Sequence, residues 1–241
     1  MTRELNAKRT GPAKADSVVV FLHGYGADGA DLLGLADPMQ PHLPNTAFYA
    51  PDAPERCINN PMGFQWFPIP WMDGSTPEQA RASAEESYRD INAFLDKVLK
   101  DEGIAPSRLA LVGFSQGTMM SLEVAPRRAV EIAGVVGFSG RLLDPEALAR
   151  DVKSRPPILL AHGDGQVGVA QQRGGLLAET GPDAADLLEL HRLLHGQREP
   201  QETEDEDRAQ DVRPQDVQRE DRPGRVHGQH RHHRVRLRVH R

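Results

Sequence analysis

The sequence predicts an α/β fold in which helices flank a mostly parallel sheet. Apolar runs rich in β-branched residues alternate with segments of helical periodicity, and such runs are typical of strands that are buried on both faces. Most of these runs end in loops that contain glycine together with histidine or serine. Because functional loops follow the carboxyl ends of parallel strands, we expect these loops to lie together at one edge of the sheet. A chain of 241 residues is long enough for one such domain.

The composition divides the chain into a compact part and an atypical C-terminal part. The last aromatic residue is Phe138 and the last isoleucine is Ile158, and the final third is rich in Arg, Gln, Asp, Glu, Gly and His. We therefore expect a polar N-terminal lead-in over residues 1–16 and a core over residues 17–164. Residues 165–241 are expected to form an atypical, largely disordered tail, because residues 197–222 are almost wholly charged or amide and only one leucine follows Leu194.

Charge and cysteine content limit the expected partners and the expected compartment. The formal net charge is −6 and the mean hydropathy is −0.55, and this mild balance does not indicate a nucleic-acid partner. Cys57 is the one cysteine, so no disulfide can form within the chain. The first residues lack the apolar segment of a signal peptide, and no apolar run is long enough to span a membrane. These features predict a cytoplasmic protein without a membrane span, and they leave its oligomeric state open.

The first elements are a strand, a glycine-rich loop and a short helix. A continuous apolar run over residues 17–22 predicts a buried strand, and a loop with three glycines begins at His23. A helix is expected over residues 31–39 and a second strand over residues 46–50. Residues 55–75 have no clear period but gather aromatic and thioether side chains. We interpret them as a long loop that either forms the apolar wall of a ligand site or buries its own aromatic groups.

The longest helix is expected between Thr76 and Gly103. Thr76 is suited to the N-cap, with Pro77 at the first helical position and Gln79 at the third, and Gly103 is suited to the C-terminal stop. The apolar positions of this helix recur at helical spacing and are interpreted as core rather than as cofactor contacts. They are Tyr88, Ile91, Phe94, Leu95, Val98 and Leu99.

The pattern G-x-S-x-G occurs at residues 113–117, where we expect a sharp turn between a strand and a helix. The apolar residues 109–112 precede it and a helix-forming segment over residues 118–124 follows it. In this context the pattern is typical of a nucleophile elbow, in which small residues permit the strained backbone of the serine. Ser115 would then be exposed at the end of the sheet, and the N–H of Gln116, at the start of a helix, would point toward a developing oxyanion. The pattern alone also fits a glycine-rich turn with an incidental serine.

Two more strands and a short helix are expected after the elbow. The strands are predicted over residues 132–138 and 158–161, and the helix over residues 145–151. Ser139 does not lie in a G-x-S-x-G pattern, and we interpret it as a loop residue.

Motifs in this order resemble the phospholipase/carboxylesterase family of α/β-hydrolases, which includes bacterial carboxylesterases similar to acyl-protein thioesterases. They are H-G-Y-G at residues 23–26, Q-W-F at 65–67, G-F-S-Q-G at 113–117 and I-L-L-A-H-G-D at 158–164. The resemblance implies the α/β-hydrolase fold, with an atypical or incomplete C-terminal part. It also implies hydrolysis of small carboxylic esters or thioesters through an acyl-enzyme, without a metal or another cofactor.

The resemblance assigns roles to residues near the elbow. It implies that Ser115 is the nucleophile and that the backbone N–H groups of Tyr25 and Gln116 form the oxyanion hole. His23 is interpreted as a structural histidine that supports the loop of Tyr25, not as the general base. If the loop over residues 55–75 forms a ligand wall, its candidate substrate contacts are Trp66, Phe67 and Trp71.

The acid and the histidine of a catalytic triad are harder to place. In α/β-hydrolases both follow the serine in the chain. The resemblance places the acid at position 166, but this chain has Gln166 there, so Asp164 is the candidate acid. His195 is the candidate base by its spacing, although residues 184–194 have the pattern of a helix rather than of the expected strand. The alternative to an active hydrolase is therefore a catalytically impaired or non-catalytic relative, or an unstable truncated product.

Three interpretations compete for the tail. It is a solvated extension without a role, or it binds a metal or a polyanion through the five His and six Arg of residues 225–241, or it is translated in a shifted reading frame. We favour the shifted frame, because the resemblance stops within a motif at Asp164 and because lysine, isoleucine and aromatic residues disappear together. A shifted frame of the coding DNA should then encode the missing acid and histidine motifs. We assign no metal site.

Overall fold

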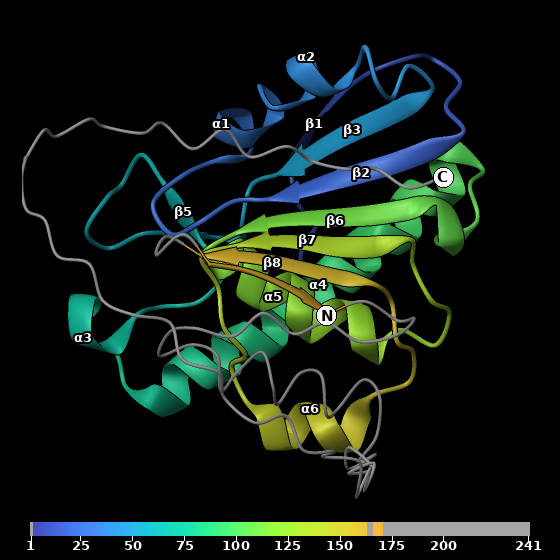
Figure 1. The fold of residues 1–241 in the computed structure, drawn as a ribbon. Coiled ribbons are helices and arrows are strands. Elements are labelled where there is room, and N and C mark those ends of the chain that lie inside the picture. Colours follow the sequence, from blue (N-terminus) through green and yellow to red (C-terminus); the bar gives the residue numbers. More distant parts are fainter. Residues whose placement is uncertain (1, 163–165, 171–241) are drawn as a thin grey trace, which may run out of the picture. The chain divides into compact units, whose positions relative to one another are not determined.

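The computed structural model describes residues 2–162 and 166–170. These residues form a seven-stranded sheet with the strand order β1-β3-β2-β6-β7-β8-β9, and β4 and β5 form a separate two-stranded pair (Figure 1). The strands of the large sheet are β1 (Ala7–Thr10), β2 (Ser17–Leu22), β3 (Thr46–Pro51), β6 (Leu109–Phe114), β7 (Gly134–Phe138), β8 (Ile158–His162) and β9 (Gln166–Ala170). The small pair consists of β4 (Glu55–Arg56) and β5 (Phe64–Gln65).

The centre of the sheet is parallel and its two edges are antiparallel. Strands β3, β2, β6, β7 and β8 run parallel to their neighbours, whereas β1 pairs antiparallel with β3 and β9 antiparallel with β8. The carboxyl ends of the parallel strands therefore lie at one edge, where the loops after β2, β6 and β7 meet (Figure 1). This arrangement confirms the predicted α/β fold with a mostly parallel sheet.

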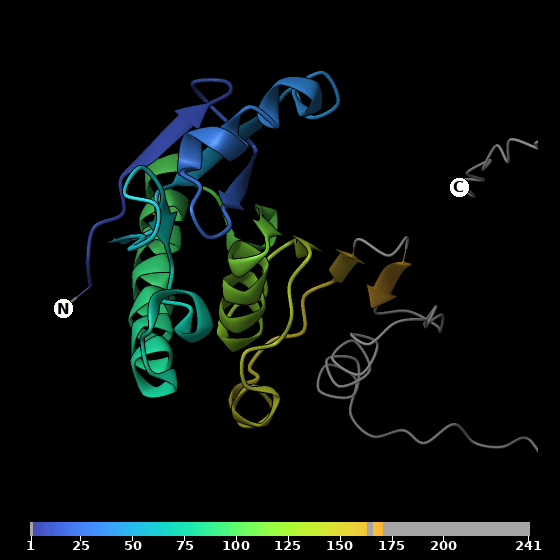
Figure 2. The same ribbon diagram turned by 90° about the vertical axis from the view of Figure 1, so that its left-hand side faces the viewer.

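Helices cover the sheet on both faces (Figures 1 and 2). The helices are α1 (Gly29–Leu33), α2 (Ala36–Met39), α3 (Pro70–Asp73), α4 (Pro77–Glu102), α5 (Gln116–Val124) and α6 (Pro145–Asp151), with short 3-10 turns at Pro106–Arg108 and Ala125–Arg127. Successive residues of β2 point to opposite faces because of the pleat of the strand. Val18 and Val20 accordingly pack in the larger core with α4 and α5, while Val19 and Phe21 pack in a smaller core with α2.

The ends of α4 follow the sequence prediction. The Thr76 side chain accepts a hydrogen bond from the Gln79 N–H, and the Gln79 side chain accepts one from the Thr76 N–H, so a capping box is present. Gly103 ends the helix with φ of 67°, a left-handed conformation that glycine adopts without strain. Most of the predicted apolar stripe is buried, whereas Tyr88 is only half-buried and lines a pocket.

Two segments differ from their predictions. The helix expected over residues 31–39 is split into α1 and α2, which flank Gly34 and Leu35. The lead-in over residues 1–16 contains β1, whose charged residues hide the strand pattern. The Arg9 side chain of β1 is held by Glu102 of α4 at 2.7 Å and lies over the ring of Tyr49 in β3, so its charge is compensated at the edge of the sheet.

The C-terminal edge of the described sheet has an atypical form. Gln166, at the position where the family resemblance places the acid, begins β9 and pairs with His162 of β8. β9 therefore runs antiparallel to β8 at this edge of the described sheet.

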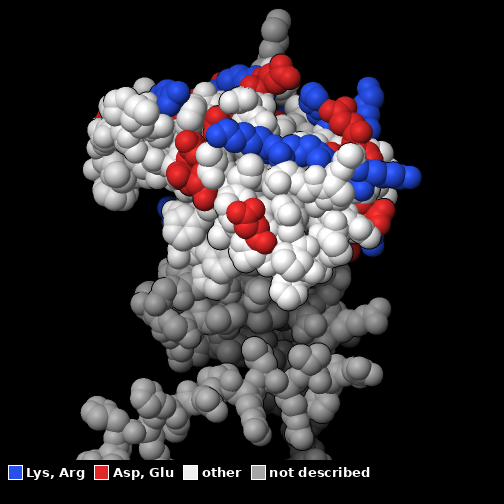
Figure 3. All heavy atoms as spheres, turned by 90° about the horizontal axis from the view of Figure 1, so that it is seen from above, with Lys and Arg blue, Asp and Glu red and all other residues white. Residues whose placement is uncertain are grey.

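The described surface that Figure 3 shows, seen from above relative to Figure 1, carries charges of both signs. Figure 3 shows Lys and Arg side chains next to Asp and Glu side chains on this face, separated by uncharged surface. Among the helices of the described residues, none combines the length and the apolar character that crossing a membrane requires.

Candidate active site

Ser115 lies in the sharp turn between β6 and α5. Its backbone has φ of 52° and ψ of −113°, a region that side-chain-bearing residues rarely occupy. The turn is held by two hydrogen bonds, from the Ser115 N–H to the carbonyl of Phe138 at 2.8 Å and from the Met119 N–H to the carbonyl of Ser115 at 3.1 Å. Ser115 is half-buried and lines a pocket, so its hydroxyl is accessible. The predicted strand–turn–helix context of the elbow is thus present.

The two glycines of the elbow allow close backbone contacts. A Cβ atom on Gly113 would lie 2.5 Å from the backbone nitrogen of Thr118, and one on Gly117 would lie 1.8 Å from the carbonyl oxygen of Leu22. Neither backbone neighbour can move aside without shifting the strand or the helix. Glycine is therefore required at both positions if α5 is to start directly beside β2 and β6.

The loop after β2 lies directly against the elbow. A Cβ atom on Gly24 would be 3.4 Å from the Cβ of Ser115. In this loop the Gly26 N–H donates to Phe64 and the Ala27 N–H donates to Gly24, whereas the Tyr25 N–H has no acceptor among the described residues. Gln116, as the first residue of α5, has no acceptor for its N–H within the helix. Both predicted oxyanion donors are thus available next to Ser115.

The buried side chain of His23 supports this loop from the interior of the protein. It has no exposed surface, its Nδ1 lies 2.7 Å from the carbonyl oxygen of Gly24, and its Nε2 lies 2.9 Å from the backbone nitrogen of Ala53. The carbonyl oxygen of Gly24 can only accept a hydrogen bond, so Nδ1 carries the proton and donates it. The N–H of Ala53 can only donate, so Nε2 is unprotonated and accepts. Burial lowers the pKa of His23 below its usual value, a direction that agrees with the neutral ring that these two hydrogen bonds require. With both ring nitrogens engaged, the interpretation of His23 as a structural residue is supported.

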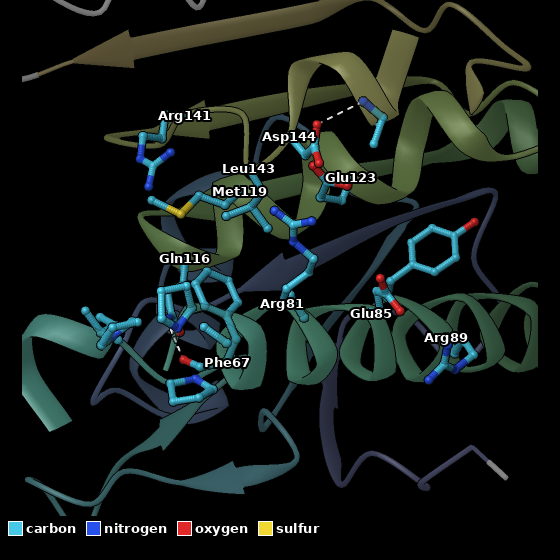
Figure 4. Close-up of a pocket in the computed structure, with 18 of the residues that line it drawn as sticks. Phe67, Arg81, Glu85, Arg89, Gln116, Met119, Glu123, Arg141, Leu143 and Asp144 are labelled. Atoms are coloured by element: carbon cyan, nitrogen blue, oxygen red, sulfur yellow. Dashed lines mark hydrogen bonds between the residues drawn. The ribbon is translucent and has the colours of Figure 1, made fainter. Parts of the chain in front are cut away.

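The side chain of Gln116 links the elbow to the Q-W-F segment. It is almost completely buried; its Oε1 accepts a hydrogen bond from the Trp66 N–H at 3.1 Å, and its Nε2 donates to the carbonyl of Phe67 at 2.8 Å (Figure 4). Trp66 in turn donates from its indole N–H to the carbonyl of His23 at 2.9 Å. These contacts hold the elbow, the loop of Tyr25 and the Q-W-F segment in one arrangement.

Trp66, expected as a substrate contact, has another position. It has no exposed surface and packs in the core, and its indole ring lies against His23, with ring centroids 5.4 Å apart. It does not contribute to the lining of the pocket beside Ser115. The Trp66 side chain packs in the core. The sequence could not show this, because residues 55–75 have no regular period that separates buried from exposed aromatic residues. Phe67 and Trp71 do line that pocket, and Trp71 is 84% exposed at its rim.

The pocket beside Ser115 has a volume of about 1100 Å³. Its wall comes from residues 67–71, α4, α5, the loop after β7 and α6 (Figure 4). Ser115 and Gln116 lie in its wall together with the apolar side chains of Phe67, Ile69, Trp71, Met119 and Leu143. Met119 follows Ser115 by one helical turn, so its place on the same face was accessible from the sequence. The contribution of Leu143 was not, because it depends on contacts between distant segments.

Another part of the pocket wall is charged. Glu123 of α5 forms an ion pair with Arg127, which also lies 3.4 Å from a carboxylate oxygen of Asp151. Burial raises the pKa of Glu123, and the neighbouring Arg127 opposes that effect. The remaining charged groups of the lining are Arg81, Glu85, Arg89, Arg141, Asp144 and Lys153.

The predicted acid and base cannot be placed in this geometry. Asp164 and His195 lie outside the described residues, as does nearly all of the predicted tail. Within residues 2–162 and 166–170, no three His, Cys, Asp or Glu side chains are grouped so that they could hold a metal ion. Among the described residues, the structure therefore brings together the candidate nucleophile Ser115, the loop of Tyr25, Gln116 and a pocket.

Comparisons with known proteins agree with this arrangement. The model of the phospholipase/carboxylesterase family matches residues 8–184. The chain is 28% identical over 176 residues to acyl-protein thioesterase 1 of Gibberella zeae; the alignment covers 68% of this chain and 75% of the relative. It is 31% identical over 170 residues to acyl-protein thioesterase 1 of Kluyveromyces lactis, in an alignment that covers 66% of this chain and 72% of the relative.

Solved structures show the same likeness. The crystal structure of esterase PE8 matches with a TM-score of 0.63 and 39% identity, over 67% of this chain and 76% of that chain. A phospholipase/carboxylesterase from Dyadobacter fermentans matches with a TM-score of 0.52 and 26% identity, over 66% of this chain and 72% of that chain.

Proposed function

Because the chain belongs to the phospholipase/carboxylesterase family of α/β-hydrolases, we propose that it cleaves small carboxylic esters or thioesters through an acyl-enzyme on Ser115. The observation that carries this proposal is the strained backbone of Ser115 at the end of β6, beside two backbone N–H groups and at the wall of a large pocket. Strained residues cluster at catalytic centres because the surrounding fold holds the reacting group in position. The family match supports the same reaction class.

The first half of the proposed reaction forms the acyl-enzyme. The Ser115 oxygen attacks the carbonyl carbon of the ester while a base removes the hydroxyl proton, and the carbonyl oxygen becomes an oxyanion. The N–H groups of Tyr25 and Gln116 donate to that oxyanion. Removal of one such donor from an enzyme costs about 3 kcal/mol of transition-state stabilisation. The tetrahedral intermediate then expels the alcohol or thiol, which takes the proton from the base.

The second half releases the acid. Water, deprotonated by the same base, attacks the acyl-enzyme, and the second tetrahedral intermediate collapses. The protonated base then gives its proton to the departing Ser115 oxygen as the carboxylic acid is released. We propose His195 as this base and Asp164 as the acid that orients it, in keeping with the chain order of α/β-hydrolases. No cofactor is needed for either step.

Labelling with a fluorophosphonate and turnover of p-nitrophenyl acetate test the proposal. Ser115→Ala should abolish both signals. Ser139→Ala is a matched control, because Ser139 also has a positive φ, of 54°, but lies outside the G-x-S-x-G pattern. His195→Ala and Asp164→Asn should lower turnover if these residues act as base and acid. Unchanged turnover in Ser115→Ala would refute the assignment of the nucleophile.

A second candidate function is binding without catalysis. One observation favours it: residue 166, where the family resemblance places the acid, is a glutamine at the start of β9 and pairs with His162 of β8. Glutamine cannot carry the negative charge that stabilises an imidazolium. A non-catalytic relative would retain the pocket and bind ester analogues but would show neither labelling nor turnover. Fluorophosphonate labelling of the wild-type chain would exclude it.

A further inference from the structure

Arg81 extends into the pocket beside the proposed nucleophile. It is in the second turn of α4 and belongs to the pocket lining. In Figure 4 its side chain extends from α4 across the pocket toward Leu143 and Glu123. Its guanidinium group forms no salt bridge or hydrogen bond with any of the described residues. The pocket therefore presents a cation whose five N–H donors are free to meet a ligand.

The neighbouring acids are engaged elsewhere. Glu123 and Asp151 both approach Arg127, so their charges are compensated by that guanidinium. A carboxylate oxygen of Asp144 accepts a hydrogen bond from the Ala147 N–H at 2.9 Å and caps α6. Glu85 lies one helical turn after Arg81 on α4; both residues are exposed, and they form no salt bridge with each other among the described residues. Glu78 precedes Arg81 by three residues on α4, and hydrogen bonds at the helix start, together with the charge of Arg81, lower its pKa. Among the described residues no acid forms a salt bridge with Arg81.

Arg81 also changes what the pocket can accept. The lining around Ser115 is apolar and includes Phe67, Met119 and Leu143. An aliphatic acyl chain bound there would run against the guanidinium group of Arg81 and strip part of its hydration without compensation. A chain that ends in a carboxylate would instead form charge-assisted hydrogen bonds with it, in the bidentate geometry that arginine favours.

We propose that Arg81 makes the pocket selective for esters or thioesters whose acyl part ends in an anionic group, such as monoesters of dicarboxylic acids. This inference rests on the proposed function of Ser115, because it specifies the substrate of the same site. Arg81 is a specificity-determining residue in this proposal and takes no part in the bond-breaking steps.

Paired substrates test the proposal with the full chain. We would measure kcat/KM for p-nitrophenyl monoesters of glutarate, adipate and suberate, and for neutral p-nitrophenyl esters of the same chain lengths. The charged member of at least one pair should be preferred by the wild type. Arg81→Ala should lower this charged-to-neutral ratio by about tenfold or more, the size expected for one charge-assisted hydrogen-bonded pair. Arg81→Lys should restore part of the ratio, since it restores the charge but not the planar geometry.

The controls separate this inference from the proposed function. Arg150→Ala, on the exposed side of α6 and outside the pocket lining, removes one positive charge and should leave the ratio unchanged. If p-nitrophenyl acetate is hydrolysed through Ser115 but the ratio is the same in wild type and Arg81→Ala, the inference is wrong and the proposed function stands. If no ester is hydrolysed, the proposed function fails, and calorimetric binding decides the inference. Adipate must then bind more tightly than hexanoate, and Arg81→Ala must remove the difference; equal binding would overturn it.

Discussion

Replacement of Ser115 by glycine should stabilise the fold although it removes the proposed nucleophile. With φ of 52° and ψ of −113°, Ser115 adopts a conformation that is strained for any residue with a Cβ atom. Such strain amounts to about 1–3 kcal/mol. Ser115→Ala keeps the Cβ and therefore the strain, whereas Ser115→Gly removes it. Glycine loses more backbone entropy on folding, which offsets about 0.5–1 kcal/mol. We expect Ser115→Gly to be more stable than Ser115→Ala by about 1 kcal/mol.

Urea unfolding of the two variants measures this difference directly. The unfolding midpoint of Ser115→Gly should lie at a higher urea concentration than that of Ser115→Ala, with the same slope, because the surface exposed on unfolding does not change. Ser139, with φ of 54°, provides a matched pair. Ser139→Gly should likewise be more stable than Ser139→Ala. If Ser115→Gly is no more stable than Ser115→Ala while the Ser139 pair differs as expected, the elbow is not strained and the reasoning is wrong.

Further predictions concern the contacts that hold the site and the sheet edge. Gly117→Ala should destabilise the fold by about 3 kcal/mol or more, because the new Cβ would meet the backbone oxygen of Leu22 at 1.8 Å; a thermal midpoint equal to that of the wild type would contradict the close contact. Gln116→Ala should cost about 2–4 kcal/mol in urea unfolding, since it leaves two buried backbone groups without their partner; a loss below 1 kcal/mol would show that the two groups find other partners. The hydrogen bond from Arg9 lowers the pKa of Glu102, so the carboxylate contributes stability above its unfolded-state pKa and loses it as the pH falls through the folded-state value. Glu102→Gln should therefore be less stable than the wild type by about 1 kcal/mol at pH 7, and the difference should shrink as the pH falls below 4.5. A difference that is constant with pH would exclude the ion pair as its cause.

The fold was predictable where one property dominates a segment. The strands at residues 17–22 and 109–114 are short, mostly apolar runs. Nearly every residue of the first is buried, and buried residues alternate with half-buried ones in most of the second, in keeping with two neighbouring strands inside the sheet. The N-terminal edge strand could not be recognised in this way. Three of the four residues 7–10 are polar, and they form a strand because β3 offers a free edge and Glu102 receives the Arg9 side chain.

The site was predictable to the extent that its groups are adjacent in the chain. Ser115 and Gln116 belong to one motif, and Tyr25 belongs to a loop that follows a recognisable strand. Trp66 was expected as a substrate contact but packs in the core, and Arg81 was not singled out. Whether a side chain packs in the core or lines the pocket depends on contacts between segments that are distant in the sequence. The roles of Asp164 and His195 stay predictions.

Gln116 has a consequence for any attempt to redesign the substrate range. The same residue supplies a proposed oxyanion donor from its backbone and holds residues 66 and 67 through its side-chain amide. Replacements at position 67 or before it therefore risk displacing the reaction centre as well as reshaping the pocket. Beyond that point the wall at Ile69 and Trp71 has no hydrogen bond to the elbow among the described residues. Variation for new substrates is best begun at these two positions, where the shape of the wall can change independently of the chemistry.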